Sequence, residues 1–205
     1  MTASGKTGDA ETLAVYQARA EDYARMIEDA APDADLQAFI ARLPVGATVL
    51  DLGCGPGAAS AVMLAAGLEV DPVDATPAMV ELARACTGNR ARLATFDDLI
   101  AHAAYDGVWA NFSLLHAPRA DLPRYLSAIR AALTEGGVFH IGMKLGAGEE
   151  RDDLGRFYSY YSRDELAGLL AAAGLEILSE EIRTEAGLSG KPAAGITILT
   201  RALPQ

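Results

Sequence analysis

Short apolar, β-rich runs alternate with helix-forming stretches along most of this chain of 205 residues. Five such runs are found before residue 145, at 48–52, 68–73, 91–96, 105–112 and 138–143. Parallel strands must be joined by crossover connections, which are usually helices, so this alternation favours βαβ units. We therefore predict an α/β fold of three layers, in which helices cover both faces of a mostly parallel sheet.

The C-terminal part of the chain departs from this alternation. Ser162 and Glu165 have the spacing of a capping box, before a helix that Gly174 ends. Two more strand-like runs, 175–182 and 195–201, follow with only turn-forming residues between them. That arrangement suits a hairpin, so we expect a seven-stranded sheet with one antiparallel strand near the C-terminus.

The chain contains no linker or internal repeat that would mark a domain boundary. We expect one domain over residues 1–205. Within it we distinguish N-terminal helices (1–44), a core (45–143), a connecting segment (144–161) and a C-terminal helix with the hairpin (162–205).

Charge and composition limit the partners that such a chain can bind. The formal net charge is −11, and no compact run of Lys or Arg offsets it, so nucleic acid and anionic membranes are disfavoured. No apolar run approaches the roughly 20 residues that span a bilayer, and we expect no signal peptide. Cys54 and Cys86 lack the spacing of a zinc site or a disulfide framework, so we expect no metal and a cytoplasmic location.

A glycine-rich turn follows the first strand, where Gly53, Gly55 and Gly57 alternate with other residues. Glycines here allow a sharp turn and the close approach of a ligand, and the following helix offers free N–H groups. Asp74 ends the second strand, 21 residues after Gly53, where a carboxylate accepts hydrogen bonds from ribose hydroxyls. These features indicate a nucleoside-containing ligand and fit NAD and an adenosine cofactor equally well.

Asp51 distinguishes between NAD and an adenosine cofactor, because it lies in the strand two residues before Gly53. A carboxylate there would repel the diphosphate of NAD but would attract a cofactor that carries an ammonium and a sulfonium. With this residue, the sequence closely resembles the class I S-adenosylmethionine-dependent methyltransferases. The resemblance covers about residues 45–202, and the family's glycine motif lies at 49–57. An NAD-dependent oxidoreductase and a non-catalytic S-adenosylmethionine-binding protein remain the alternatives.

The resemblance implies a Rossmann-like sandwich and a set of cofactor-binding residues. The backbone of Gly53, Cys54 and Gly55 would hold the aminocarboxypropyl end of S-adenosylmethionine, with Asp51 near its amino group. Asp74 would bind the ribose. The remaining cofactor contacts implied are Ala75 and Met79 against the adenine, Asp97 or Asp98 at its amino group, Asn111 beside the transferred methyl group, and Tyr16 and Tyr23 closing over the cofactor.

The acceptor side is less constrained by the sequence. His116 follows the fourth strand on the cofactor side of the sheet and is the candidate general base, or else it packs at the start of a helix. The connecting segment 144–161 either forms a lid over an anionic or aromatic small molecule or is an ordered structural loop. Its candidate substrate-binding residues are Lys144, Arg156, Tyr158, Tyr160 and Tyr161. We expect methyl transfer to a small molecule, releasing S-adenosylhomocysteine, by a monomer or homodimer.

Overall fold

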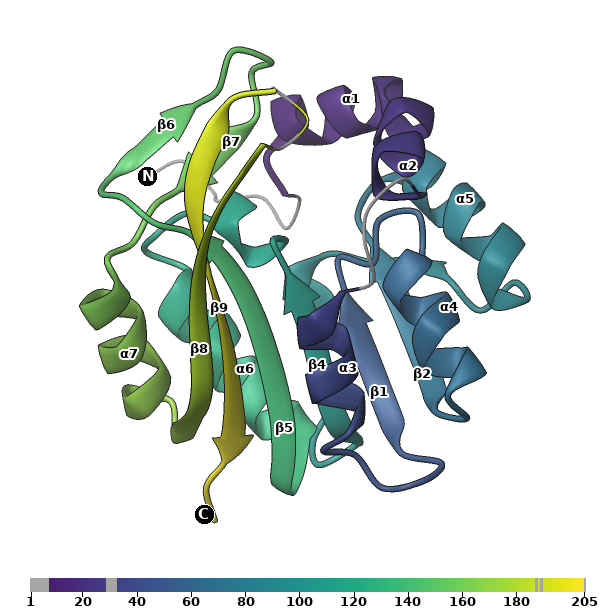
Figure 1. Cartoon of the computed structure of the whole chain (residues 1–205), viewed down its shortest axis with the longest axis vertical. Coiled ribbons are helices and arrows are strands. Elements are labelled where there is room, and N and C mark those ends of the chain that lie inside the picture. The colour runs from purple at the N-terminus through teal and green to yellow at the C-terminus, as the bar shows by residue number, and fades with distance from the viewer. Residues whose placement is uncertain (1–7, 29–32, 187, 189, 205) are drawn as a thin grey trace.

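A seven-stranded sheet runs through the computed structural model, which describes residues 8–28, 33–186, 188 and 190–204 (Figure 1). Its strands lie in the order β3-β2-β1-β4-β5-β9-β8. In chain order they are β1 (Thr48–Leu52), β2 (Glu69–Asp74), β3 (Arg92–Leu93), β4 (Tyr105–Asn111), β5 (Leu133–Lys144), β8 (Leu175–Ala186) and β9 (Pro192–Ala202). All neighbouring pairs are parallel except those of β9, which runs antiparallel to both β5 and β8. The predicted fold class is therefore confirmed.

Helices connect the strands and also precede them. They are α1 (Ala10–Ala18), α2 (Ala20–Glu28), α3 (Ala34–Ile40), α4 (Ala58–Ala65), α5 (Pro77–Thr87), α6 (Leu122–Ala132) and α7 (Arg163–Ala172), with short 3₁₀ helices η1 (Phe96–Asp98) and η2 (Leu114–His116). The predicted capping box at Ser162 and Glu165 begins α7. Parts of the predicted N-terminal segment, residues 1–7 and 29–32, lie outside the described residues. No helix in the described ranges is long and apolar enough to cross a membrane.

Alternate residues of the central strands divide the core into two layers. On one face, Leu50 and Ala110 pack with Leu126 of α6 and Leu170 of α7. On the other face, apolar residues of β1 and β4 pack against those of α3 and α4. Their buried side chains include Val49, Trp109, Phe39 and Met63. This alternation is the period of two expected of strands that are buried on both sides.

The third strand is shorter than the run at 91–96 predicts. β3 is at the edge of the sheet, and only Val73 and Asp74 of β2 pair with it. The chain then leaves the sheet at Thr95, whose backbone N–H and hydroxyl both donate to the Asp98 carboxylate in a capping box. This cap starts η1, which is a single 3₁₀ turn.

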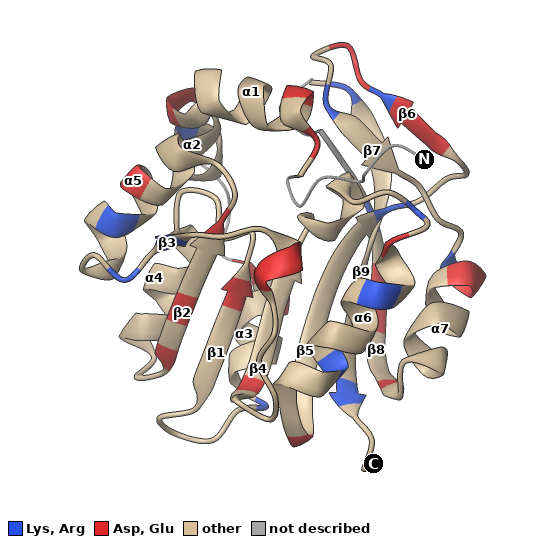
Figure 2. Ribbon diagram, turned by 180° about the vertical axis from the view of Figure 1, so that it is seen from behind, with Lys and Arg blue, Asp and Glu red and all other residues tan. Residues whose placement is uncertain are grey.

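The connecting segment 144–161 contains a two-stranded antiparallel hairpin, β6 (Glu149–Arg151) and β7 (Phe157–Ser159). The hairpin and α1 lie beyond the carboxyl ends of the parallel strands, at the top of Figure 1. Acidic residues of the α1 region and basic residues of the hairpin meet at this junction (Figure 2). The edge where β1, β2 and β4 end is therefore covered by two segments that are far apart in the sequence, α1 and the β6–β7 hairpin.

Candidate active site

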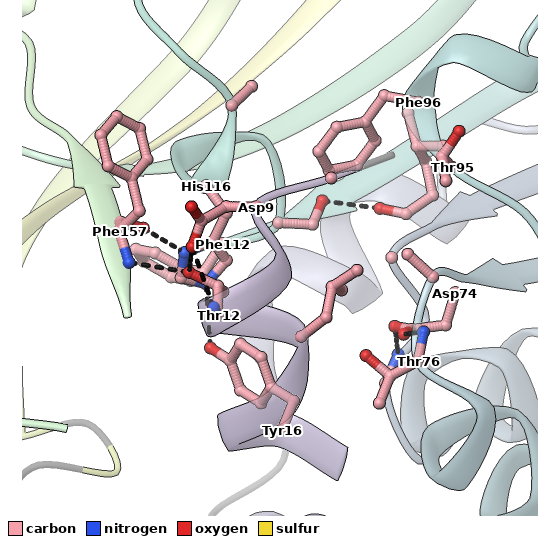
Figure 3. A pocket seen from close by; sticks show the side chains of 18 of the residues that line it. Asp9, Thr12, Tyr16, Asp74, Thr76, Thr95, Phe96, Phe112, His116 and Phe157 are labelled. Atoms are coloured by element: carbon pink, nitrogen blue, oxygen red, sulfur yellow. Dashed lines mark hydrogen bonds between the residues drawn. The ribbon is translucent and has the colours of Figure 1, made fainter. Parts of the chain in front are cut away.

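A cavity of about 350 Å³ opens at this covered edge. Its floor includes the last residue of three strands, Leu52 of β1, Asp74 of β2 and Asn111 of β4. Figure 3 shows Asp74 and Thr76 on one side of it, and Tyr16, His116 and Phe157 on the other. The predicted residues that line it are Tyr16, Tyr23, Gly53, Gly55, Asp74, Ala75, Met79, Asp97, Asn111 and His116.

The glycine turn is fixed against β2 before any ligand binds. The backbone N–H groups of Gly53 and Cys54 both donate to the Val73 carbonyl, at 2.8 and 2.9 Å. Gly53 has a φ of +82°, and a Cβ there would lie 2.4 Å from the Cβ of Ser113. Only glycine fits both the conformation and this close approach of the loop after β4. The turn thus leaves its surface open to a ligand.

Asp74 joins the glycine turn to the start of α5. One carboxylate oxygen accepts from the Gly55 N–H at 3.0 Å, and the other accepts from the Thr76 N–H at 2.8 Å. Burial raises the pKa of Asp74, while these hydrogen bonds favour the charged form. Because each carboxylate oxygen has more than one lone pair, both can still accept from a ribose diol.

Asp51 lies in the core beneath the turn and is not on the cavity wall. Its carboxylate accepts from the Ser60 hydroxyl of α4 at 2.5 Å. Burial raises the pKa of Asp51 to about 7, although the Ser60 hydrogen bond opposes this shift. The Asp51 carboxyl is therefore partly protonated at neutral pH, and a nearby cation would favour its charged form.

The two candidate acids after β3 have different surroundings. Asp97 lines the cavity and accepts hydrogen bonds from Arg124 and from the Tyr125 hydroxyl. Asp98 instead holds Thr95 in the capping box and is not on the wall. Of the two, only Asp97 is placed to meet a ligand in this cavity.

His116 is held by a hydrogen bond at each ring nitrogen. Nδ1 lies 2.6 Å from the Phe157 carbonyl oxygen, which only accepts, so Nδ1 carries the proton. Nε2 then accepts from the Tyr16 hydroxyl at 2.9 Å. Burial lowers the pKa of His116 to about 4, so the imidazole is neutral at physiological pH. Arg156 also donates to the Tyr16 oxygen, at 3.1 Å.

Side-chain contacts join α1 to the β6–β7 hairpin, and together these two segments form the cover of the cavity. Arg151 pairs with the Asp9 carboxylate at 2.7 and 2.9 Å, and the Phe157 N–H donates to the Thr12 hydroxyl at 2.8 Å. Asp9 is also the N-cap of α1 and accepts from the Thr12 N–H. The hydrogen bond from Arg151 is the main reason that the pKa of Asp9 is lowered. One carboxylate therefore both caps α1 and ties it to the hairpin.

The five predicted substrate residues do not line this cavity. Arg156 is buried and pairs with Asp152 at 2.6 Å, which uses its charge within the hairpin. The Lys144 ammonium lies over the Tyr158 ring. Arg119 lies over the Tyr161 ring, whose hydroxyl has no hydrogen-bond partner among the described residues. Tyr160 packs beside Tyr158. Cys54 is also absent from the wall.

Several wall residues were not predicted from the sequence. They are aromatic or polar residues from η1, the loop after β4, α1, α6 and the hairpin, namely Thr12, Phe96, Phe112, Tyr125, Arg151 and Phe157. Phe157 belongs to the predicted connecting segment 144–161, but the sequence does not indicate that it lines the cavity. Within the described ranges, no group of three or more His, Cys, Asp or Glu side chains is suited to hold a metal ion.

Comparisons with known proteins agree with this geometry. A family model described as a methyltransferase domain matches residues 19–180. No curated protein sequence matches the chain. The Burkholderia thailandensis 1,6-didemethyltoxoflavin-N1-methyltransferase, solved with 1,6-didemethyltoxoflavin and S-adenosylhomocysteine bound, is 26% identical, with a TM-score of 0.74 over 95% of this chain and 88% of that chain.

Two more distant solved structures share the fold. A methyltransferase structure from Methanosarcina mazei is 16% identical, with a TM-score of 0.73 over 86% of this chain and 100% of that chain. A TehB-like methyltransferase from Corynebacterium glutamicum is 19% identical, with a TM-score of 0.68 over 89% and 97% of the two chains. These findings do not favour an NAD-dependent oxidoreductase. The family match covers most of the chain, and the chain belongs to the class I S-adenosylmethionine-dependent methyltransferases.

Proposed function

We propose that this protein transfers the methyl group of S-adenosylmethionine to a small-molecule acceptor. The observation that carries this proposal is that one cavity joins the glycine turn and Asp74 to His116 and Phe157. Its volume of about 350 Å³ falls in the range of small-molecule sites. The cover of α1 and the hairpin would obstruct a macromolecule, and the net charge of −11 opposes a nucleic-acid substrate.

The cofactor contacts that we propose follow from where the structure places each group. Asp74 accepts from the ribose hydroxyls, and Asp97, the acid on the wall, accepts from the adenine amino group. Asp51 lies below the glycine turn, where its negative charge attracts the ammonium of the amino-acid end. Tyr23 has a hydroxyl with no hydrogen-bond partner in the described part of the chain, and its ring lies beside Gly55. The Tyr23 hydroxyl and the remaining lone pairs of the Asp74 and Asp97 carboxylates fit the polar groups of the cofactor.

We propose an aromatic acceptor with a proton on its nucleophilic nitrogen or oxygen. Phe112 and Phe157 give the acceptor end two aromatic side chains. The Arg151 and Arg124 guanidinium groups at the wall are already paired with carboxylates, so an anionic acceptor finds no unpaired cation there among the described residues. The relative that is 26% identical is an N1-methyltransferase, which supports a nitrogen acceptor.

The residues at the acceptor end are arranged to remove that proton. When bound, S-adenosylmethionine supplies an electrophilic methyl group for in-line displacement by the acceptor atom. We propose that Tyr16 takes the acceptor's proton at Oη as its own proton passes to His116 Nε2. An aromatic nitrogen or oxygen that has accepted the methyl group and still carries its proton is far more acidic than the neutral acceptor, so a weak base such as His116 suffices. The Phe157 carbonyl holds the Nδ1 proton throughout.

A methyl-transfer assay tests the proposal. The protein is incubated with S-adenosylmethionine carrying a labelled methyl group and a panel of aromatic N–H and O–H compounds, including 1,6-didemethyltoxoflavin. We expect labelled product from at least one compound, and stabilisation in a thermal-shift assay by S-adenosylhomocysteine but not by NAD. Stabilisation by NAD alone would refute the proposal. Tight S-adenosylhomocysteine binding without turnover would favour a non-catalytic binding protein.

A further inference from the structure

His140 is a buried histidine of β5 that lies behind the cavity and is not part of its wall. Its side chain is 2% exposed and stacks on the Trp109 ring at 3.7 Å between centroids. His140 Nε2 lies 3.0 Å from the Oδ1 atom of Asn111. A carboxamide oxygen only accepts, so Nε2 carries the proton and donates it. Burial lowers the pKa of His140 to about 3, so this neutral tautomer persists over the physiological pH range.

The Asn111 side chain has a hydrogen-bond partner at Oδ1 but none at Nδ2 among the described residues. A Cβ at Gly142 would lie 2.5 Å from Asn111 Oδ1, so the glycine provides the space that this oxygen occupies. The Phe112 N–H donates to the Gly142 carbonyl at 3.1 Å, which fixes the backbone beside it. No atom of the described residues accepts from Asn111 Nδ2, and Asn111 lines the cavity. With Oδ1 bound to His140, Nδ2 is the end of the amide that remains available to a ligand.

Asn111 is level with the glycine turn. Asp51 of β1 pairs with Trp109 of β4 in parallel register. Gly53 and Asn111 are each two residues further along, so Gly53, the first residue after β1, is level with Asn111, the last residue of β4. The amide donor therefore lies beside the place proposed for the amino-acid end of the cofactor, which carries a carboxylate. A hydrogen bond from a fixed amide to a carboxylate is among the stronger ones in proteins.

We propose that His140 is a positioning residue for cofactor binding. It holds Asn111 through Oδ1 so that Nδ2 donates to the carboxylate of the cofactor's amino-acid end. This inference rests on the proposed function, because it requires S-adenosylmethionine or its product in the cavity. His140 itself touches no ligand and acts only through Asn111.

The test compares two ligands across four variants. S-adenosylhomocysteine has the carboxylate, whereas 5′-methylthioadenosine keeps the nucleoside and sulfur but lacks the amino-acid end. The variants are Asn111→Ala, His140→Phe, the double variant and His140→Gln. Phenylalanine keeps an aromatic ring on Trp109 but removes the donor, and glutamine restores an N–H near Nε2. Each Kd is measured by calorimetry, with the Tm as a check on folding.

We expect Asn111→Ala and His140→Phe each to weaken S-adenosylhomocysteine binding about tenfold, the scale of one hydrogen bond to a charged group. Binding of 5′-methylthioadenosine should be unchanged. The double variant should bind no more weakly than Asn111→Ala, and His140→Gln should retain most of the affinity.

Three results would overturn the inference. Unchanged S-adenosylhomocysteine binding by His140→Phe would show that Asn111 does not depend on His140. Equal weakening of both ligands would indicate general damage to the cavity, as would losses that multiply in the double variant. Failure of the unaltered protein to bind S-adenosylhomocysteine would be a different outcome, because it would refute the proposed function itself.

Discussion

The Tyr16 hydroxyl and His116 Nε2, one hundred residues apart in the chain, share a hydrogen bond of 2.9 Å at the acceptor end of the cavity. The two rings also meet edge to face, with centroids 5.4 Å apart. Because the Phe157 carbonyl fixes the Nδ1 proton, Nε2 has only an acceptor role in the neutral ring. This contact joins α1 to η2 and gives the tyrosine a partner that can take its proton.

Tyr16→Phe and His116→Gln should therefore lower kcat without a comparable loss of cofactor affinity. General-base groups contribute about 100-fold or more to rate, and we expect losses of that size in both variants. The rate carried by His116 should be level above pH 6 and should fall only as the pH approaches the pKa of about 4, because the neutral form is the base. Steady-state kinetics with an acceptor from the panel measures both effects. A kcat retained in both variants would contradict the proton path.

Asp74→Ala should weaken S-adenosylhomocysteine binding at least tenfold, because two ribose hydroxyls lose a charged acceptor. Asp71→Ala provides a matched control on the same strand. The Asp71 carboxylate accepts from Arg92 and Tyr105 and does not line the cavity. Calorimetry on the two variants compares them directly. A change of less than about 1 kcal/mol for Asp74→Ala would mean that the ribose assignment is wrong.

Gly53→Ala should destabilise the fold more than Gly67→Ala does. The two glycines have φ values of +82° and +83°, so an alanine is strained at both. A Cβ at Gly67 meets no atom within 4 Å, whereas one at Gly53 lies 2.4 Å from Ser113 Cβ. Overpacking of this kind costs about 1–3 kcal/mol, which urea unfolding of both variants will measure. Equal losses would show that the approach of Ser113 does not constrain the turn.

Cofactor binding near pH 7 should release protons from Asp51. In the free protein its pKa is about 7, so a large fraction of the molecules carry the acid form at neutral pH. The ammonium of S-adenosylhomocysteine favours the carboxylate, which lowers this pKa and expels the proton. Calorimetry in buffers with different ionisation enthalpies measures the release, and Asp51→Asn should abolish it. Equal release by Asp51→Asn would place the titrating group elsewhere.

The parts of this molecule that sequence reasoning predicts are those encoded locally. The alternation of apolar runs predicts the sheet, because strand and helix periods are visible within short windows. The glycine turn and Asp74 are adjacent to strand ends, so their meeting at one edge follows from parallel strands. The run 91–96 predicts a third strand that is longer than β3. Its sequence does not indicate that only two residues of β2 pair with it.

The acceptor end depends on contacts between distant segments, and these leave little local signal. Thr12 meets the Phe157 backbone 145 residues later, and Arg151 meets Asp9 across 142 residues. The sequence predicts five substrate-binding residues in 144–161, but it does not indicate which of its side chains pair with one another. Arg156 and Asp152 are four residues apart, so their pairing was the one contact that spacing alone could have suggested.

The site proposed for S-adenosylmethionine is the cavity between the glycine turn and α1. A crystal structure of the protein with S-adenosylhomocysteine tests it most directly. We expect the ribose hydroxyls on the Asp74 carboxylate, the adenine amino group at Asp97 and the amino-acid end beside Gly53, with the sulfur facing Tyr16 and His116. S-adenosylhomocysteine bound elsewhere, or bound with its ribose away from Asp74, would contradict it.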